Sequence, residues 1–329
     1  MKKKRQSGFT LIEMMTSLGI FMAVSAIVMS GMVQMVKTQG TVANRTEMHT
    51  SVRSATELLQ QEIGQAGRIS LPNSVMPVTM TGAITANLTT AQNATLSSTV
   101  NMFPNMLLDI DAGQNFEVVT ATAVSPGNIS AIFTKSHAAG ATVQVSGAFG
   151  TGIVPPAAGL ACATTGYTGY LGPGTGSNCN TLKLYGDING DGNIVYVEYS
   201  CVTNPNGTPG YLYRNEVANA VVLGTTKPAV NPTMYLLNNV EPNPTGAGCF
   251  SYQVQNASVS GTSTPFVTDV ALTITVQTQL LDPQTNQYQQ ETKALLNITP
   301  RNVFYVWEAT SLGEVPRNQP MPTNVASLL

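Results

Sequence analysis

Charge is the property that this sequence has least of. Lys, Arg, Asp and Glu make up only 10% of its 329 residues, against roughly 25% in an average soluble domain. The formal net charge of −2 excludes the basic face expected of a nucleic-acid-binding protein. With two histidines, His49 and His137, and no recognisable catalytic motif around either, we do not expect an enzyme. A thinly charged chain rich in Thr, Asn and Gly instead favours an extracytoplasmic, β-rich protein.

The longest apolar run lies at the N-terminus. The 28 residues from Phe9 to Val36 include one charged residue, Glu13. A helix of this length would reach roughly 42 Å, more than the hydrocarbon core of a bilayer, and it is too long for a secretory signal peptide. The basic residues before it, Lys2, Lys3, Lys4 and Arg5, are expected to stay in the cytoplasm. The sequence therefore predicts a single-pass membrane helix whose head lies outside the cytoplasm, which would be a periplasmic head if the chain crosses an inner membrane.

Glu13 is an unusual residue in this run. A carboxylate inside an apolar span is costly, so it needs a partner, and no Lys or Arg follows it within one helical turn. Cleavage of the chain after Gly8 would supply a positive charge, the new α-amino group of Phe9. Residues 8–13, Gly-Phe-Thr-Leu-Ile-Glu, resemble the processing site of type IV pilins and type II secretion pseudopilins.

This resemblance implies a set of roles and partners. A prepilin peptidase would cut after Gly8 and methylate Phe9, and Glu13 would pair with the N-terminal amine of a neighbouring subunit. Other major and minor pilins would be the partners, and the protein would pass from the inner membrane into a filament at the cell surface. Nucleic acid is not an expected partner.

Weaker similarities point to one subgroup. Residues 59–67, 211–214 and 299–303 resemble stretches of PilW-type minor pilins, which implies a subunit at or near the filament tip that helps to initiate assembly. A GspJ-like pseudopilin of type II secretion is the alternative within the same family. A tip adhesin, in which residues 70–180 bind a surface, is an alternative of another class.

The remaining pattern predicts an α+β fold. We expect a cleaved leader over residues 1–8, a pilin helix over 9–68 and a β-rich antiparallel head over 69–329. Apolar residues recur at helical spacing through the second half of the helix at Val42, Met48, Val52, Ala55, Leu59, Ile63 and Ala66. Charged residues are expected on its other face at Arg45, Glu47, Arg53, Glu57 and Glu62. Later, alternation over residues 270–280 predicts a strand whose hairpin partner is 288–299, and residues 303–307 are expected as an edge strand.

Four cysteines lie in the predicted head: Cys162, Cys179, Cys201 and Cys249. An oxidising periplasm favours two disulfides, and four cysteines allow three pairings. We favour Cys162–Cys179 with Cys201–Cys249, because the first pair closes a Gly-rich loop locally. A zinc site is excluded because no two cysteines have the close spacing of zinc ligands.

An acidic turn follows one predicted strand. Asp187, Asn189 and Asp191 have the spacing of the first ligands of an EF-hand calcium loop. Glu198 stands at the twelfth position, but β-branched and aromatic residues before it predict a strand that carries it away from the loop. Calcium bound by the first three residues and a polar hairpin turn without any metal are equally good interpretations. No other cofactor is expected.

Overall fold

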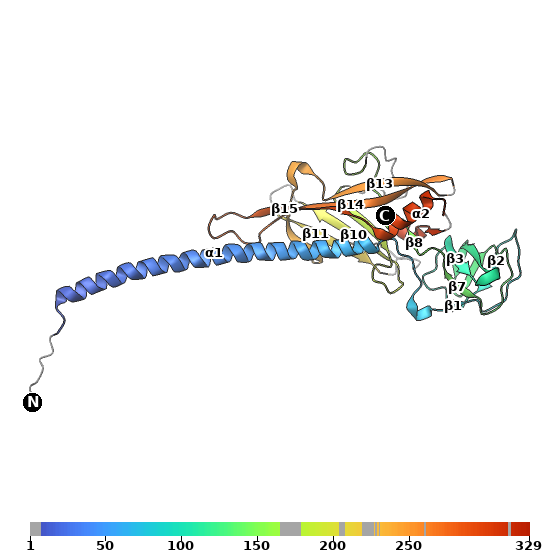
Figure 1. Ribbon diagram of the computed structural model, residues 1–329, viewed down its shortest axis with the longest axis horizontal. Helices are drawn as coiled ribbons and strands as arrows, with labels where there is room; N and C mark the ends of the chain where they lie inside the picture. The colour runs from blue at the N-terminus through green and yellow to red at the C-terminus, as the bar shows by residue number, and fades with distance from the viewer. Residues whose placement is uncertain are drawn as a thin grey trace, which may run out of the picture. The chain divides into compact units, whose positions relative to one another are not determined.

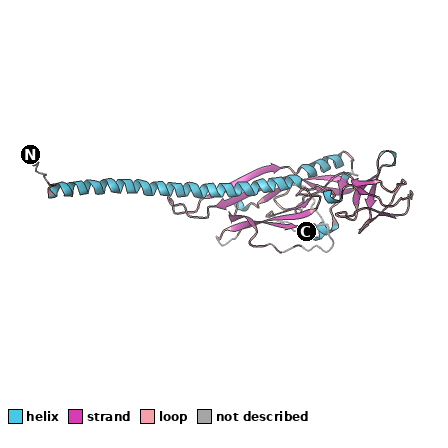
Figure 2. Cartoon of the chain, turned by 90° about the horizontal axis from the view of Figure 1, so that it is seen from below, coloured by secondary structure: helices cyan, strands magenta, loops and turns pink. Residues whose placement is uncertain are grey.

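The computed structural model describes residues 8–164, 179–203, 208–218, 227, 229, 231–259, 261–314 and 317–329. Residues 2–5 of the predicted leader and most of the Gly-rich loop, residues 165–178, lie outside these ranges. The chain falls into two compact units. The first joins residues 1–50 to residues 277–290, and the second joins residues 51–276 to residues 291–329. The predicted α+β class is confirmed: one long helix precedes a part of the chain built mainly from strands (Figure 2).

The long helix, α1, runs over Leu11–Gln65, as predicted, and is drawn in blue in Figure 1. Two residues after its end stands Gly67, whose φ of 81° lies in the left-handed region that glycine adopts without strain. Close packing is a second requirement there, because a Cβ at this position would lie 2.6 Å from the carbonyl oxygen of Gly150. A glycine at the end of α1 therefore both stops the helix and lets the next strand pair approach.

The second half of α1 buries most of the predicted apolar stripe. Met48, Val52, Ala55, Leu59, Ile63 and Ala66 are all buried. Val42 is an exception, with 58% of its surface exposed. The prediction that Glu62 lies on the exposed face is wrong: its side chain is buried and bonded to Tyr199 and Arg214. A hydrophobic pattern cannot identify a charged residue as buried when the partners of that residue lie far away in the sequence.

Among the described residues, the largest sheet has seven strands in the order β13-β14-β12-β11-β10-β9, with β15 paired to β14. Its members are β9 (Thr181–Gly186), β10 (Val195–Val202), β11 (Gly210–Val217), β12 (Tyr235–Glu241), β13 (Phe250–Val259), β14 (Thr262–Gln277) and β15 (Gln290–Ile298). β9 and β10 are buried nearly throughout, so their sequences read as continuous apolar and aromatic runs rather than as an alternation. β14 and β15 form the predicted hairpin and lie side by side in Figure 1.

Smaller sheets are formed mainly by the segment between α1 and β9. One sheet has the order β1-β7-β3-β4, another the order β2-β6-β5, and β8 pairs in parallel with β16. Their bounds are β1 (Val78–Thr79), β2 (Gln92–Thr95), β3 (Met106–Ile110), β4 (Glu117–Ala121), β5 (Ala123–Ser125), β6 (Asn128–Ala131), β7 (Thr142–Val145), β8 (Phe149–Gly150) and β16 (Asn318–Gln319). Short 3₁₀ turns lie at η1 (Asn73–Val75), η2 (Gly113–Asn115) and η3 (Pro244–Gly246). Side chains of these sheets share one core with Tyr185 and Tyr196 of the large sheet.

The predicted edge strand at residues 303–307 is wrong, because this segment belongs to helix α2 (Arg301–Ser311). Val303, Val306 and Thr310 are its buried residues, and their spacing of three and four is that of one helix face. Pro300 precedes the first turn, where a missing N–H costs little. A short helix, α3 (Thr323–Ser327), follows in the C-terminal segment and places Val325 in the shared core.

Candidate functional site

The start of α1 is held by its own side chains. Thr10 precedes the first helical residue, and its N–H and hydroxyl donate to the Glu13 carboxylate at 2.9 and 2.8 Å. In return the Glu13 N–H lies 3.4 Å from the Thr10 hydroxyl oxygen. This is a reciprocal capping box, in which the spacing Thr-x-x-Glu satisfies N–H groups that the first helical turn leaves unpaired. The sequence-based expectation for Glu13 considered only its charge. The Thr-x-x-Glu spacing is the signal in the sequence that identifies Thr10 as the cap of this helix.

The residues around the predicted cleavage position are accessible. Gly8 has no atoms within 4 Å of where a Cβ would stand, and Phe9 is 87% exposed. Only Phe9 and Thr10 separate the peptide bond between these two residues from Leu11, the first residue of α1. A protease could therefore reach this bond without unfolding the helix.

The first half of α1 is apolar on every side and covered by nothing in the described residues. Each large apolar side chain from Leu11 to Val36 is more than half exposed. By length and composition this helix is long and apolar enough to cross a membrane. In water such a surface would be strongly unfavourable, since each buried CH₂ is worth about 0.8 kcal/mol. We therefore expect lipid or other apolar helices to cover this surface.

The acidic turn between β9 and β10 does not present its oxygens together. Asp187 is buried, accepts from the Ser70 hydroxyl at 2.5 Å and lies 3.6 Å from the Arg68 guanidinium. Asp191 is exposed, and both of its carboxylate oxygens accept from Asn193, at 2.8 Å each. Within the described residues, no group of three or more His, Cys, Asp or Glu side chains could hold a metal ion.

These contacts support the hairpin-turn interpretation of the acidic loop. The bonds from Asn193 hold the pKa of Asp191 below its usual value, and they brace the turn without a metal. Glu198 lies in β10, where its carboxylate accepts from Tyr196 and from Lys227. Asn189, the third residue of the predicted calcium set, is exposed. The calcium interpretation stays a prediction.

The structure pairs the cysteines in the way that the sequence favoured. Cys162 is bonded to Cys179 with a Cα–Cα distance of 5.7 Å, and Cys201 to Cys249 with 6.3 Å. The second bridge joins β10 to the start of β13 across the large sheet. The first bridge holds Cys162 and Cys179 beside β13, where their backbone carbonyls accept from the N–H groups of Tyr252 and Phe250, respectively. Both bridges therefore lie at the start of β13.

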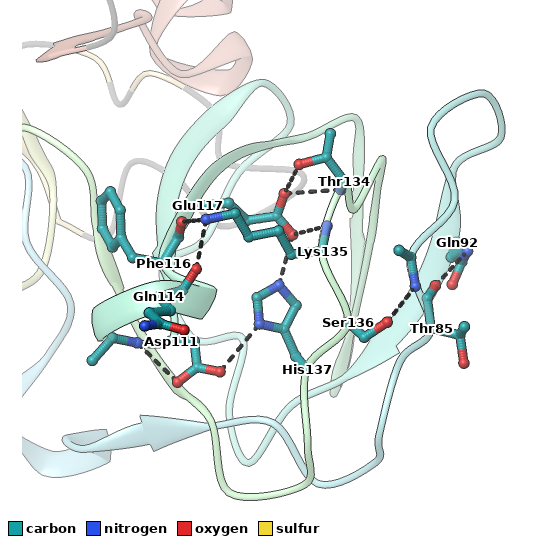
Figure 3. A network of polar contacts seen from close by, with 12 residues as sticks. Thr85, Gln92, Asp111, Gln114, Phe116, Glu117, Thr134, Lys135, Ser136 and His137 are labelled. Carbon is teal, nitrogen blue, oxygen red and sulfur yellow. Dashed lines mark hydrogen bonds and ion pairs between the residues drawn. The ribbon is translucent and has the colours of Figure 1, made fainter.

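A buried polar network lies within the smaller sheets (Figure 3). His137 is 2% exposed, and its ring nitrogens lie 2.6 Å from a Glu117 oxygen and 3.3 Å from an Asp111 oxygen. Glu117 also accepts from the Thr134 hydroxyl and from the backbone N–H groups of Thr134 and Lys135. Burial pushes the pKa of Glu117 upwards, but these hydrogen bonds hold it below its usual value. The sequence offered no partner for His137, because its carboxylates lie 20 and 26 residues away.

We read this network as a structural brace. The imidazole is enclosed and both nitrogens contact carboxylates, so neither is presented to a substrate. The Lys135 ammonium donates to the carbonyls of Gln114 and Phe116. These bonds tie residues 134–137 to β4 and to the turn before it.

Comparison with known families identifies one segment. The model of the prokaryotic N-terminal methylation motif matches residues 3–29. This stretch contains Gly8, Phe9, the capping box and three quarters of the apolar run. Comparisons with curated proteins and with solved structures gave no match. The matched motif and the apolar first half of α1 fit a membrane-anchored, type IV pilin-like protein, either a pilin or a pseudopilin.

Proposed function

We propose that this protein is a minor pilin subunit of a type IV pilus-like filament, processed by a prepilin peptidase after Gly8 and methylated on Phe9. Its α1 helix packs among the helices of other pilins, and its head lies at or near the filament tip, where it helps to initiate assembly. The observation that carries the proposal is the bare apolar half of α1, which begins directly after the predicted cleavage position.

The length of this bare segment supports storage in the membrane followed by assembly. From Leu11 to Val36 a helix rises about 39 Å, enough to cross the roughly 30 Å hydrocarbon core. Outside lipid the same surface is stable only within a bundle of apolar helices. Packing among other pilin helices requires only the helix. The large β-rich head with its two disulfides therefore suits a minor subunit.

Processing is the first test. Mass spectrometry of the mature chain should find methylated Phe9 at the N-terminus, and Gly8→Val should leave the leader attached, because a branched side chain obstructs the bond that must be cut. A mature N-terminus at any other residue would contradict the pilin proposal. Recovery of the protein in sheared filaments supports a pilus, whereas retention in the envelope of a secreting cell supports a GspJ-like pseudopilin, the second candidate.

Glu13 gives a second, independent test. We propose that its carboxylate pairs with the Phe9 amine of a neighbouring subunit during assembly. Glu13→Ala should therefore still be cleaved but should enter filaments poorly. Thr10→Val is the matched control, because it removes the hydroxyl of the capping box and leaves the carboxylate in place. If Thr10→Val and Glu13→Ala lower incorporation equally, Glu13 acts as a helix cap and the pairing role is wrong.

A further inference from the structure

The loop that joins β14 to β15 is fastened to α1. We call residues 277–290 the hairpin tip; it belongs to the same compact unit as residues 1–50. Asp282 lies at its centre and accepts from the Thr41 hydroxyl at 2.6 Å and from the Gln284 N–H at 2.9 Å. The Gln284 side chain in turn donates to the Thr38 hydroxyl at 3.0 Å.

Gly40 allows the hairpin tip to touch the helix. A Cβ at Gly40 would stand 3.0 Å from Cγ of Pro283, tighter than ordinary van der Waals contact. On the next turn, the Asn44 amide lies 3.5 Å from the carbonyl oxygens of Leu280 and Leu281. The hairpin tip is therefore held at one level of α1 by packing and by polar contacts together.

This level is the point where the apolar run ends. Thr38, Gly40 and Thr41 follow Val36 by two to five residues, which corresponds to about 3–8 Å along the helix axis. If the run from Phe9 to Val36 crosses the hydrocarbon core, the hairpin tip stands in the headgroup layer at the head side of the bilayer.

The exposed side chains of the hairpin tip suit that layer. Leu280, Leu281 and Tyr288 are 65%, 43% and 49% exposed. Asp282 is the one charged residue of the tip, and its carboxylate is engaged by Thr41, Gln284, Thr285 and Gln289. Lys37 and Arg45 lie on the adjoining helix turns. Aromatic and apolar side chains beside cations are typical of protein surfaces at the lipid headgroups.

We propose that the hairpin tip is a membrane-interface contact, in which Leu280, Leu281 and Tyr288 enter the headgroup layer of a phospholipid bilayer. The proposal rests on the proposed function, because it requires α1 to span the bilayer before assembly. Lipid is favoured over a protein partner because the tip contacts α1 directly after the apolar run ends. From Val36 to Asn44, where these contacts lie, Lys37 is the one charged residue of the helix.

The test places an environment-sensitive dye on single cysteines of the full chain in vesicles of phosphatidylethanolamine and phosphatidylglycerol that carry a headgroup-level or a deep quencher. Leu281→Cys reports the hairpin tip and Val28→Cys reports the span. Thr50→Cys is the control, since it is exposed and lies about 21 Å beyond Val36 along the helix. Non-reducing peptide maps verify that the two native disulfides persist in each labelled protein.

We expect the shallow quencher to act on the Leu281 label, the deep quencher to act on the Val28 label, and neither to act on Thr50. Adding Gly40→Leu should displace the hairpin tip and lower quenching at Leu281 to the Thr50 level, with Val28 unchanged. An unquenched Val28 label would contradict the membrane span and the proposed function with it. A quenched Val28 label beside an unquenched Leu281 label would overturn the hairpin-tip proposal alone, as would a Leu281 label shielded only when other pilins are added.

Discussion

The contact between Glu62 and the large sheet should be an essential stabilising feature of the second unit. The Glu62 carboxylate accepts from Nη2 of Arg214 at 2.6 Å and from the Tyr199 hydroxyl at 2.5 Å. The Glu62 side chain is 6% exposed and that of Arg214 20% exposed. Burial, together with the negative charge of Glu62, raises the pKa of Tyr199. Burial alone would lower the pKa of Arg214, but the bonds to Glu62 and Glu216 raise it.

Replacing Glu62 by Ala would leave the Arg214 charge and the Tyr199 hydroxyl without this carboxylate. Breaking a buried ion pair by removing one partner costs about 3–5 kcal/mol. Arg214 keeps Glu216 at 2.6 Å and some contact with solvent, so we expect the lower end of that range, about 3 kcal/mol. For a domain of this size each kcal/mol shifts Tm by roughly 2–4 °C, which predicts a loss of about 6–12 °C.

The assay is thermal unfolding of the detergent-solubilised chain, followed by circular dichroism with both disulfides intact. Glu57→Ala is the matched control, because its partner Arg53 lies on the same helix and both side chains are mostly exposed, so Tm should not change. The combined variant Glu62→Leu, Tyr199→Phe and Arg214→Met should recover most of the loss, since well-packed apolar residues can replace a buried ion pair. A loss below about 1 kcal/mol for Glu62→Ala, the range of surface pairs, would refute the reasoning.

Further predictions concern the bridges, the hairpin tip and the acidic turn. Removing Cys201–Cys249 should destabilise the head by about 4 kcal/mol and removing Cys162–Cys179 by about 3 kcal/mol on the loop-entropy estimate, because the bridges close loops of 48 and 17 residues; equal losses in urea unfolding would contradict that order. Hydrogen bonds from Thr41 and Gln284 lower the pKa of Asp282 to about 2, so its stabilising effect is present above about pH 4 and is lost towards pH 2. Protection factors at residues 282–287, which are exchange rates corrected for the intrinsic pH dependence of amide exchange, should fall over that interval and stay constant in Asp282→Asn. Calorimetry at millimolar calcium distinguishes the two interpretations of the acidic turn: a plain turn gives no saturable heat, whereas a saturable heat abolished by Asp191→Ala would establish calcium.

Features that depend on neighbours in the sequence could be predicted. The apolar run, the amphipathic stripe from Met48 to Ala66 and the β14–β15 hairpin each follow from a local period. The cysteine pairing was favoured for the local closure of one loop. The position of β10 was predictable from its β-branched and aromatic residues, and this also explains why Glu198 lies on a strand.

Features that depend on distant partners could not be predicted. Glu62 bonds to Arg214, which lies 152 residues away in the sequence, and Thr41 bonds to Asp282, which lies 241 residues away. A polar residue at a buried position has the same local pattern as one on a solvated face, so only the fold distinguishes them. The strand prediction for the α2 segment was wrong for another reason. Its aromatic and β-branched residues have high strand propensity, but packing of Val303 and Val306 against the core overrides that preference.

In a chain with so few charges, the buried Glu62–Arg214 pair also affects how the helix is oriented on the sheet. The stripe of Leu59, Ile63 and Ala66 is apolar and smooth, and such a stripe tolerates small rotations of a helix against a sheet. Glu62 adds a position that is satisfied only when it faces Tyr199 and Arg214. Arg68, just past the end of α1, lies 3.6 Å from the buried Asp187 but is itself 43% exposed, so its contact restrains the helix less. Buried ion pairs are weak sources of net stability but can specify a single arrangement, so we infer that the Glu62–Arg214 pair fixes which face of residues 51–65 meets the sheet.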